Sequence, residues 1–156
     1  TGVRGITLDN DGQDEVIGMI CIKDLETESV MVVSEQGYGK RSEIEDYRIT
    51  NRGGKGVKTL NITEKTGNLV AIKSVTDEND LVIINKSGIT LRMKVADVRI
   101  MGRATQGVRL INLEKRNDEI ASVCKVLSET ESDSSNSENI DSASEINEAE
   151  ASETTE

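Results

Sequence analysis

The feature that most constrains the fold of this chain is an internal repeat at an offset of 51 residues. GYGKR at 37–41 aligns with GITLR at 88–92, and GVK at 56–58 aligns with GVR at 107–109. A third, partial copy, GVR at 2–4, lies 54 residues before the segment at 56–58. Such a repeat predicts an array of similar units, each of which buries its apolar face against a neighbour.

Each complete repeat carries the pattern of a β-hairpin. In VMVVSEQGYGKR at 30–41 and in LVIINKSGITLR at 81–92, an aliphatic run meets a turn that ends in glycine, Gly37 or Gly88, and a second strand follows. A further apolar run follows each GV segment, at 14–22, 68–75 and 118–126. Four short strands in about 50 residues is the period of a propeller-like array, and helical periodicity is weak, so we predict an all-β fold.

Charge divides the chain into two parts. Residues 1–127 carry 19 basic and 19 acidic side chains, whereas residues 128–156 carry 10 acidic and no basic ones. The second part is mostly Ser, Glu, Asp, Asn, Thr and Ala, and it has too few apolar residues to offset the entropy of ordering. We therefore predict a propeller-like domain of about two and a half blades at 1–127, with its missing neighbours upstream, and a disordered acidic tail at 128–156.

Composition excludes several kinds of catalytic and metal site. The chain has no histidine, and therefore no imidazole base, no Ser-His or Cys-His nucleophile pair and no His-ligated metal. Cys21 and Cys124 match no zinc-ligand spacing, so we expect two buried, reduced thiols and a cytoplasmic protein. No apolar run is long enough for a membrane helix. Tyr38 and Tyr47 are the only aromatic residues, and we expect both to pack rather than to react.

Basic residues are concentrated in the two repeats. Residues 40–109 hold 14 basic and 8 acidic side chains, a net charge of +6, and the cations recur at the same repeat positions. Side chains alternate along a strand, so the cation after each GV pair lies at the end of an apolar stripe, with its head in solvent. We expect Arg48 and Arg99 to pair with the acid two residues before each, and the other repeated cations to form a rim that binds a polyanion. The cations expected on this rim are Lys40, Arg41, Lys58, Arg92, Arg103 and Arg109.

The sharpest motif is RGGKG, at 52–56. It consists of Arg52, Gly53, Gly54, Lys55 and Gly56, so two cations share one loop and the glycines permit close backbone approach to a phosphate. The alternative is a glycine-rich turn between strands whose charges are incidental. The motif is not a nucleotide-binding P-loop, because a strand pattern follows Gly56 in place of GK[ST] and a helix.

Four segments together resemble the C-terminal domain of the A subunit of bacterial DNA gyrase. They are GYGKR at 37–41, RGGKG at 52–56, MGRATQGVRLINL at 101–113 and DEIASV at 118–123, and the resemblance covers residues 1–127. It implies a β-pinwheel, a relative of the propeller, that bends duplex DNA around its basic rim. RGGKG is similar to the family's signature, the gyrase A box, which by the same resemblance is needed for DNA wrapping and negative supercoiling.

The resemblance also implies a place in a larger enzyme, an ATP-dependent type II topoisomerase with two A and two B subunits (A2B2). The partners of this chain would be duplex DNA, the rest of the A subunit, the gyrase B subunit, and no membrane. In that family the DNA-cleaving tyrosine lies in another part of the A subunit, and the ATP and Mg2+ sites belong to the B subunit. We therefore expect no catalytic residue and no cofactor in this chain.

The box departs from the family pattern at its first two positions, where Thr50 and Asn51 replace a glutamine and a cation. Only one further repeat follows it, so either the box lies in a late blade of this protein or a second box lies upstream. Two other interpretations stay open. One is the equivalent domain of topoisomerase IV, which typically has a degraded or missing box, and the other is a protein-interaction propeller, whose repeats are richer in Gly, Trp and His. The intact RGGKG and the basic excess favour the gyrase domain.

Overall fold

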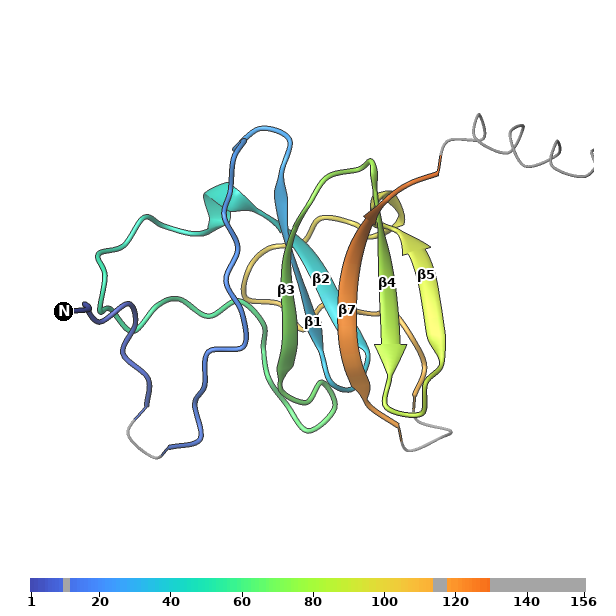
Figure 1. Ribbon diagram of the computed structural model, residues 1–156, viewed down its shortest axis with the longest axis horizontal. Coiled ribbons are helices and arrows are strands. Elements are labelled where there is room, and N and C mark those ends of the chain that lie inside the picture. The colour runs from blue at the N-terminus through green and yellow to red at the C-terminus, as the bar shows by residue number, and fades with distance from the viewer. Residues whose placement is uncertain (10–11, 114–117, 130–156) are drawn as a thin grey trace, which may run out of the picture.

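The computed structural model describes residues 1–9, 12–113 and 118–129, and its strands form two antiparallel sheets that stack on one another (Figure 1). The first sheet has the strand order β3-β1-β2-β6 and the second β5-β4-β7. The strands are β1 (Ser29–Ser34), β2 (Tyr38–Glu43), β3 (Leu69–Val75), β4 (Asn79–Asn85), β5 (Thr90–Lys94), β6 (Val108–Arg109) and β7 (Ile120–Leu127). The prediction of an all-β fold is confirmed. The predicted disordered tail lies outside the described residues beyond position 129.

The repeat predicted from the sequence is present in the structure. A shift of 51 residues brings β1, β2 and β3 onto β4, β5 and β7, and it brings the 3-10 turn η1 (Ile44–Asp46) onto η2 (Val95–Asp97). Both hairpins turn where predicted, with Gly37 at φ +80° and Gly88 at φ +85°. These angles lie in the left-handed region that side chains rarely adopt, so glycine at the last turn position allows each hairpin to close.

The four-stranded sheet is assembled from two repeats. β6 belongs to the second repeat, yet it pairs with β2 of the first, with Tyr38 opposite Arg109 and Gly39 opposite Val108. β3 pairs with the other side of the same hairpin, along β1. The second sheet has three strands, and in the described part of the chain no strand lies on the outer edge of β5.

The two faces of the first sheet pack into different apolar clusters, because side chains alternate along β1. Met31 and Val33 belong to the main core, which residues of both sheets form. Val30 and Val32 pack instead against Leu60, from the segment that follows the RGGKG loop. Burying one such aliphatic side chain stabilises the fold by about 2 kcal/mol. Both faces of the first sheet are therefore covered by apolar side chains. On one face, the contact with Leu60 holds the segment that follows the RGGKG loop against the sheet.

Residues 47–68, and the described part of 1–28, contain no strand, so strands cover less of residues 1–127 than the repeat pattern predicted. GVRGITL at 2–8 and GVKTLNI at 56–62 match the segment that contains β6, but no strand equivalent to β2 lies beside them in the described structure. An extended segment needs a neighbour for its backbone hydrogen bonds before it becomes a strand. Apolar side chains of these regions are accordingly exposed, namely Val3, Ile6, Leu8, Val16, Ile17, Met19 and Ile62.

Both cysteines are exposed free thiols, so the prediction that they are buried was wrong. On β7 the reason is alternation, because Val123 is buried in the core and its neighbour Cys124 points the other way. Within the described residues, no helix is long and apolar enough to span a membrane.

Candidate nucleic-acid interface

The RGGKG loop is held by hydrogen bonds to the N-terminal segment. The Gly53 N–H donates to the Gly5 carbonyl (2.8 Å), and the Thr7 N–H donates to the Gly54 carbonyl (2.9 Å). The Thr7 hydroxyl also donates to the Gly53 carbonyl (2.6 Å). Gly53 and Gly56 have φ of +77° and +79°, a conformation that favours glycine at both positions. The loop backbone therefore holds a defined shape between its two cations.

Arg52 and Lys55 extend from this loop into solvent. Both residues are exposed, and neither makes a hydrogen bond or ion pair with any residue that the structure describes. Lys58 is exposed as well, and its Nζ donates to Asn61 Oδ1 at 3.4 Å. Cations that are exposed in this way are available to an anionic ligand. Three of the cations predicted from the sequence are therefore exposed.

Arg4, the repeated cation of the first, partial copy, lies beside this group. The hydrogen bond between Gly5 and Gly53 brings Arg4 against the loop, and the Arg4 carbonyl oxygen lies 3.6 Å from where a Cβ on Gly53 would be. The Arg4 residue is exposed. A signal was present in the sequence, because Arg4 occupies the repeat position of Lys58. We include it in the candidate interface.

Lys40 does not lie on an exposed rim, which corrects the prediction from the sequence. The side chain of Lys40 is wholly buried, and its Nζ donates to the carbonyls of Gly102 (2.9 Å) and Arg103. Burial lowers the pKa of Lys40 below its ordinary value, although the carboxylate of Asp46 opposes this. A buried ammonium group needs acceptors, and the loop of the second repeat supplies them. Lys40 therefore ties that loop to β2.

Arg41 is also buried, contrary to the predicted rim position. Its Nε donates to Ser29 Oγ on β1, and its Nη1 pairs with the carboxylate of Asp77, which follows β3. The arginine therefore links the second strand of the hairpin to the first strand and to the chain beyond the third. Its role is structural, whereas the sequence predicted a contact with phosphate.

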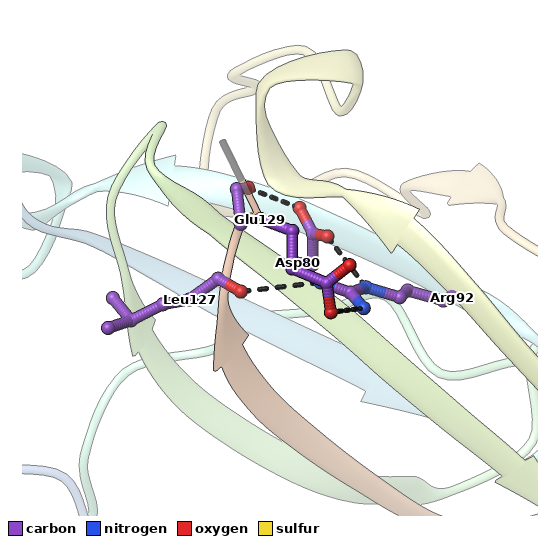
Figure 2. Close-up of polar contacts among 5 residues, drawn as sticks. Asp80, Arg92, Leu127 and Glu129 are labelled. Atoms are coloured by element: carbon purple, nitrogen blue, oxygen red, sulfur yellow. Dashed lines mark hydrogen bonds and ion pairs between the residues drawn. The ribbon is translucent and has the colours of Figure 1, made fainter. Parts of the chain in front are cut away.

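Arg92 occupies the same position in the second repeat and makes the same kind of link. Its Nε lies 2.8 Å from Asp80 Oδ2, its Nη1 lies 2.9 Å from Glu129 Oε1, and its Nη2 donates to the Leu127 carbonyl at 3.3 Å (Figure 2). The side chain keeps 40% of its surface exposed. Two carboxylates nevertheless compensate its charge, so Arg92 is a poorer candidate for phosphate binding than the sequence predicted.

Arg103 is used to join the two repeats. Its Nε donates to the Asp46 carbonyl at 3.1 Å, and its Nη1 donates to the Lys58 carbonyl. Both acceptors lie in the repeat that precedes it. The predicted rim cation is therefore held by backbone acceptors, close to the candidate interface around Lys58.

Arg109 lies over the ring of Tyr38, with its guanidinium carbon 5.5 Å from the ring centroid, and its Nη2 donates to the Tyr38 hydroxyl at 2.9 Å. Lys65 Nζ also contacts this ring, at 5.6 Å. Tyr38 is 8% exposed, which agrees with its predicted packing role. The sequence prediction missed Lys65, because no repeat position or motif marks it. Arg109 and Lys65 form a second exposed cationic site.

Arg48 and Arg99 are exposed and form no ion pair in the part of the chain that the structure describes, so the predicted pairing with the preceding acids was wrong. The prediction placed each arginine and its acid on one strand face. Each acid instead ends a 3-10 turn, η1 or η2, where the alternation of a strand does not apply.

Comparison with known proteins identifies the family. The chain matches the model of the DNA gyrase C-terminal domain, beta-propeller, over residues 1–23, 28–76 and 79–124. The chain belongs to this family. It is 47% identical to the DNA gyrase A subunit of Staphylococcus aureus (strain NCTC 8325 / PS 47) over 138 residues, which are 88% of this chain and 15% of that protein. It is 53% identical to the same protein of strain MRSA252 over 113 residues, 72% of this chain and 12% of that protein.

Two solved structures share the fold. The C-terminal domain of DNA topoisomerase IV matches with a TM-score of 0.73 at 21% identity, covering 81% of this chain and 38% of that one. The DNA gyrase A C-terminal domain matches with a TM-score of 0.60 at 27% identity, covering 65% and 34%. The first likeness shows the fold alone, at that low identity. The chain spans only 12–15% of the length of the curated gyrase A subunits that it matches.

Proposed function

We propose that this chain is a DNA-binding and DNA-wrapping part of a DNA gyrase A subunit, which bends duplex DNA around a basic surface to enable negative supercoiling. The observation that carries the proposal is the exposure of Arg52 and Lys55 on a glycine loop, in a chain of the gyrase C-terminal domain family. Arg4 and Lys58 extend the same surface. The identity to gyrase A subunits and the intact RGGKG favour gyrase over topoisomerase IV.

The surface would act on the phosphate backbone. Cations that neutralise phosphates release condensed counterions, which makes binding strong at low salt and insensitive to sequence. The main exposed cations of the loop lie among glycines, where the backbone can approach the duplex closely. We therefore assign these residues to holding and bending duplex DNA, with sequence preference only through how easily the DNA bends.

The enzyme would be the complete complex and not this chain. From its family, the chain would act in the cytoplasm as part of an A subunit. Two A subunits and two gyrase B subunits would form the A2B2 assembly. ATP and Mg2+ would be used by other parts of that assembly. We assign no catalytic role to Tyr38 or Tyr47, because Tyr38 packs under Arg109 and the Tyr47 hydroxyl bonds Thr59 Oγ1.

The test is the double variant R52A/K55A in the complete gyrase tetramer, with the substitutions made in full-length A chains. We expect negative supercoiling to be lost while relaxation and decatenation persist. The slope of log K against log salt for duplex binding should fall by about two units, since each contacted phosphate adds about 0.9.

The matched control is K23A/K125A, which removes two exposed lysines outside the basic stretch at 40–109. It should keep both supercoiling and the salt slope. Wild-type supercoiling and slope in R52A/K55A would show that the loop is a structural turn and would reject the proposal.

A further inference from the structure

The outer edge of β2 receives a continuous segment of the following repeat, at 100–110. The Met101 N–H donates to the Arg41 carbonyl (2.8 Å), and the Leu110 N–H donates to the Gly37 carbonyl (2.8 Å). Between these two contacts β6 pairs with the start of β2. The segment therefore binds β2 as a loop and a strand together. Its backbone contacts would be available on any exposed strand, so side chains must decide which strand is used.

Three residues of β2 are adapted to this segment. A Cβ at Gly39 would lie 2.5 Å from Leu110 Cδ1 and 2.8 Å from the Val32 carbonyl oxygen, so the position has no room for a side chain. Lys40 donates to two carbonyls of the incoming loop, and the Ser42 hydroxyl donates to the Met101 carbonyl at 2.9 Å. Together these side chains leave space for the strand and satisfy the carbonyls that the loop buries.

The equivalent positions of β5 carry none of these features. A shift of 51 residues replaces Gly39, Lys40 and Ser42 by Thr90, Leu91 and Met93. Threonine fills the space that glycine leaves open, and leucine and methionine have no donor for a loop carbonyl. The turn glycine and the arginine of the hairpin are kept, because Gly88 matches Gly37 and Arg92 matches Arg41 in position, and each arginine pairs with a carboxylate. Two further positions also differ, because Ile89 replaces Tyr38, which lies opposite Arg109 of β6, and Lys94 replaces Glu43.

We propose that Gly39, Lys40 and Ser42 form a socket that determines whether a hairpin receives its fourth strand, and that β5, which lacks this socket, is a terminal edge of the array. A segment like 100–110 that paired with β5 would clash with the Thr90 side chain and bury its loop carbonyls without donors, which costs more than pairing returns. Exposed Lys94 adds a charge of the kind that discourages pairing at an edge strand. The proposal does not depend on DNA binding.

The first test compares amide hydrogen exchange in two proteins. One is the 156-residue chain, and the other is the full-length gyrase A subunit that contains it. Amides of residues 90–94 should exchange at the same rate in both, because no segment of the longer protein adds to β5. Amides of residues 100–110 should be protected in both. Protection of 90–94 that rises tenfold or more in the full-length protein would overturn the proposal, since a strand would then pair without the socket.

The second test exchanges the socket residues between the hairpins. K40L/S42M should raise exchange at 100–110 about tenfold while β4 and β7 keep their protection, since donors to three carbonyls are lost. The converse variant T90G/L91K/M93S, given a free peptide of residues 98–113, should gain protection at 90–94 that wild type with the same peptide does not. Unchanged exchange at 100–110 in K40L/S42M, or no gain in the converse variant, would reject the socket.

Discussion

Arg52 and Arg103 lie at the same position of the two repeats, and the structure uses them differently. Arg103 donates to the carbonyls of Asp46 and Lys58 in the preceding repeat, whereas Arg52 is exposed and has no partner among the described residues. The loops around them also differ, because the first keeps a lysine and two adjacent glycines that the second lacks. The comparison shows that a repeat position sets the backbone, while the neighbouring repeat decides whether a side chain is available for binding.

The largest expected difference between the two loops is at their last glycine. Gly56 and Gly107 both have positive φ, +79° and +78°. A Cβ on Gly56 would meet nothing nearer than Ile6 Cδ1 at 3.7 Å, whereas one on Gly107 would lie 2.5 Å from the Gly39 carbonyl oxygen. Gly56→Ala should cost about 1 kcal/mol of unfolding free energy from conformation alone, and Gly107→Ala about 3 kcal/mol or more. Urea denaturation of the 156-residue chain measures both. Equal losses would mean that the two loops are packed alike.

The arginines themselves give the next largest effect. Arg103→Ala should lower the free energy of unfolding by about 1–2 kcal/mol, because two carbonyl acceptors lose a charged donor at a partly exposed site. Arg52→Ala should leave the free energy of unfolding unchanged and weaken duplex binding. Denaturation and DNA titration of the same two variants separate these effects. If Arg52→Ala were the more destabilising, the distinction between a structural and an available arginine would fail.

The acidic segment gives a smaller effect that depends on salt. Residues 130–156 carry nine acidic and no basic side chains, and we propose that they compete with DNA for the exposed cations of the first repeat. Deleting them keeps Glu129 and its ion pair with Arg92. Duplex binding at low salt should tighten about threefold, and the gain should shrink as screening increases. The same affinity with and without the segment across the salt titration would make it a solubility tail.

The smallest expected effect concerns Ser29 and Asp80, which lie at equivalent positions of the two repeats. Ser29 accepts a hydrogen bond from Arg41, and Asp80 pairs with Arg92. Hydrogen bonds from Ser128 and then from Arg92 lower the pKa of Asp80 below its ordinary value of 3.8. A lowered carboxyl pKa adds stability that is present above that value and is lost as pH falls through the folded-state pKa. Asp80→Asn should remove this part of the acid sensitivity, and Ser29→Ala should not. Urea denaturation between about pH 5 and pH 2 tests the pair. A wild-type acid profile in Asp80→Asn would contradict it.

Much of the fold followed from the sequence, whereas the candidate site followed only in part. The hairpins were predictable because Gly37 and Gly88 end turns between aliphatic runs, and turn chemistry is local. The exposure of Arg52 and Lys55 agreed with the motif. The burial of Lys40 and Arg41 was not predictable, because it depends on segments far along the chain that fold back onto β2. Lys65 was missed because no repeat position or motif marks it, and its aromatic partner Tyr38 lies in a different part of the chain.

The sequence by itself determined the repeat, its strand-rich class, the turn positions and the separation of charge between the repeats and the tail, because all of these depend on local patterns and on composition. Only the tertiary structure decided which cations face solvent and which repeat completes which sheet. The physical reason is that β6 belongs to one repeat by sequence and to the other by hydrogen bonding. The side chains of β2 therefore lie in an environment that their own repeat does not contain. A cation on β2 is buried or exposed according to which segment of the next repeat packs against it.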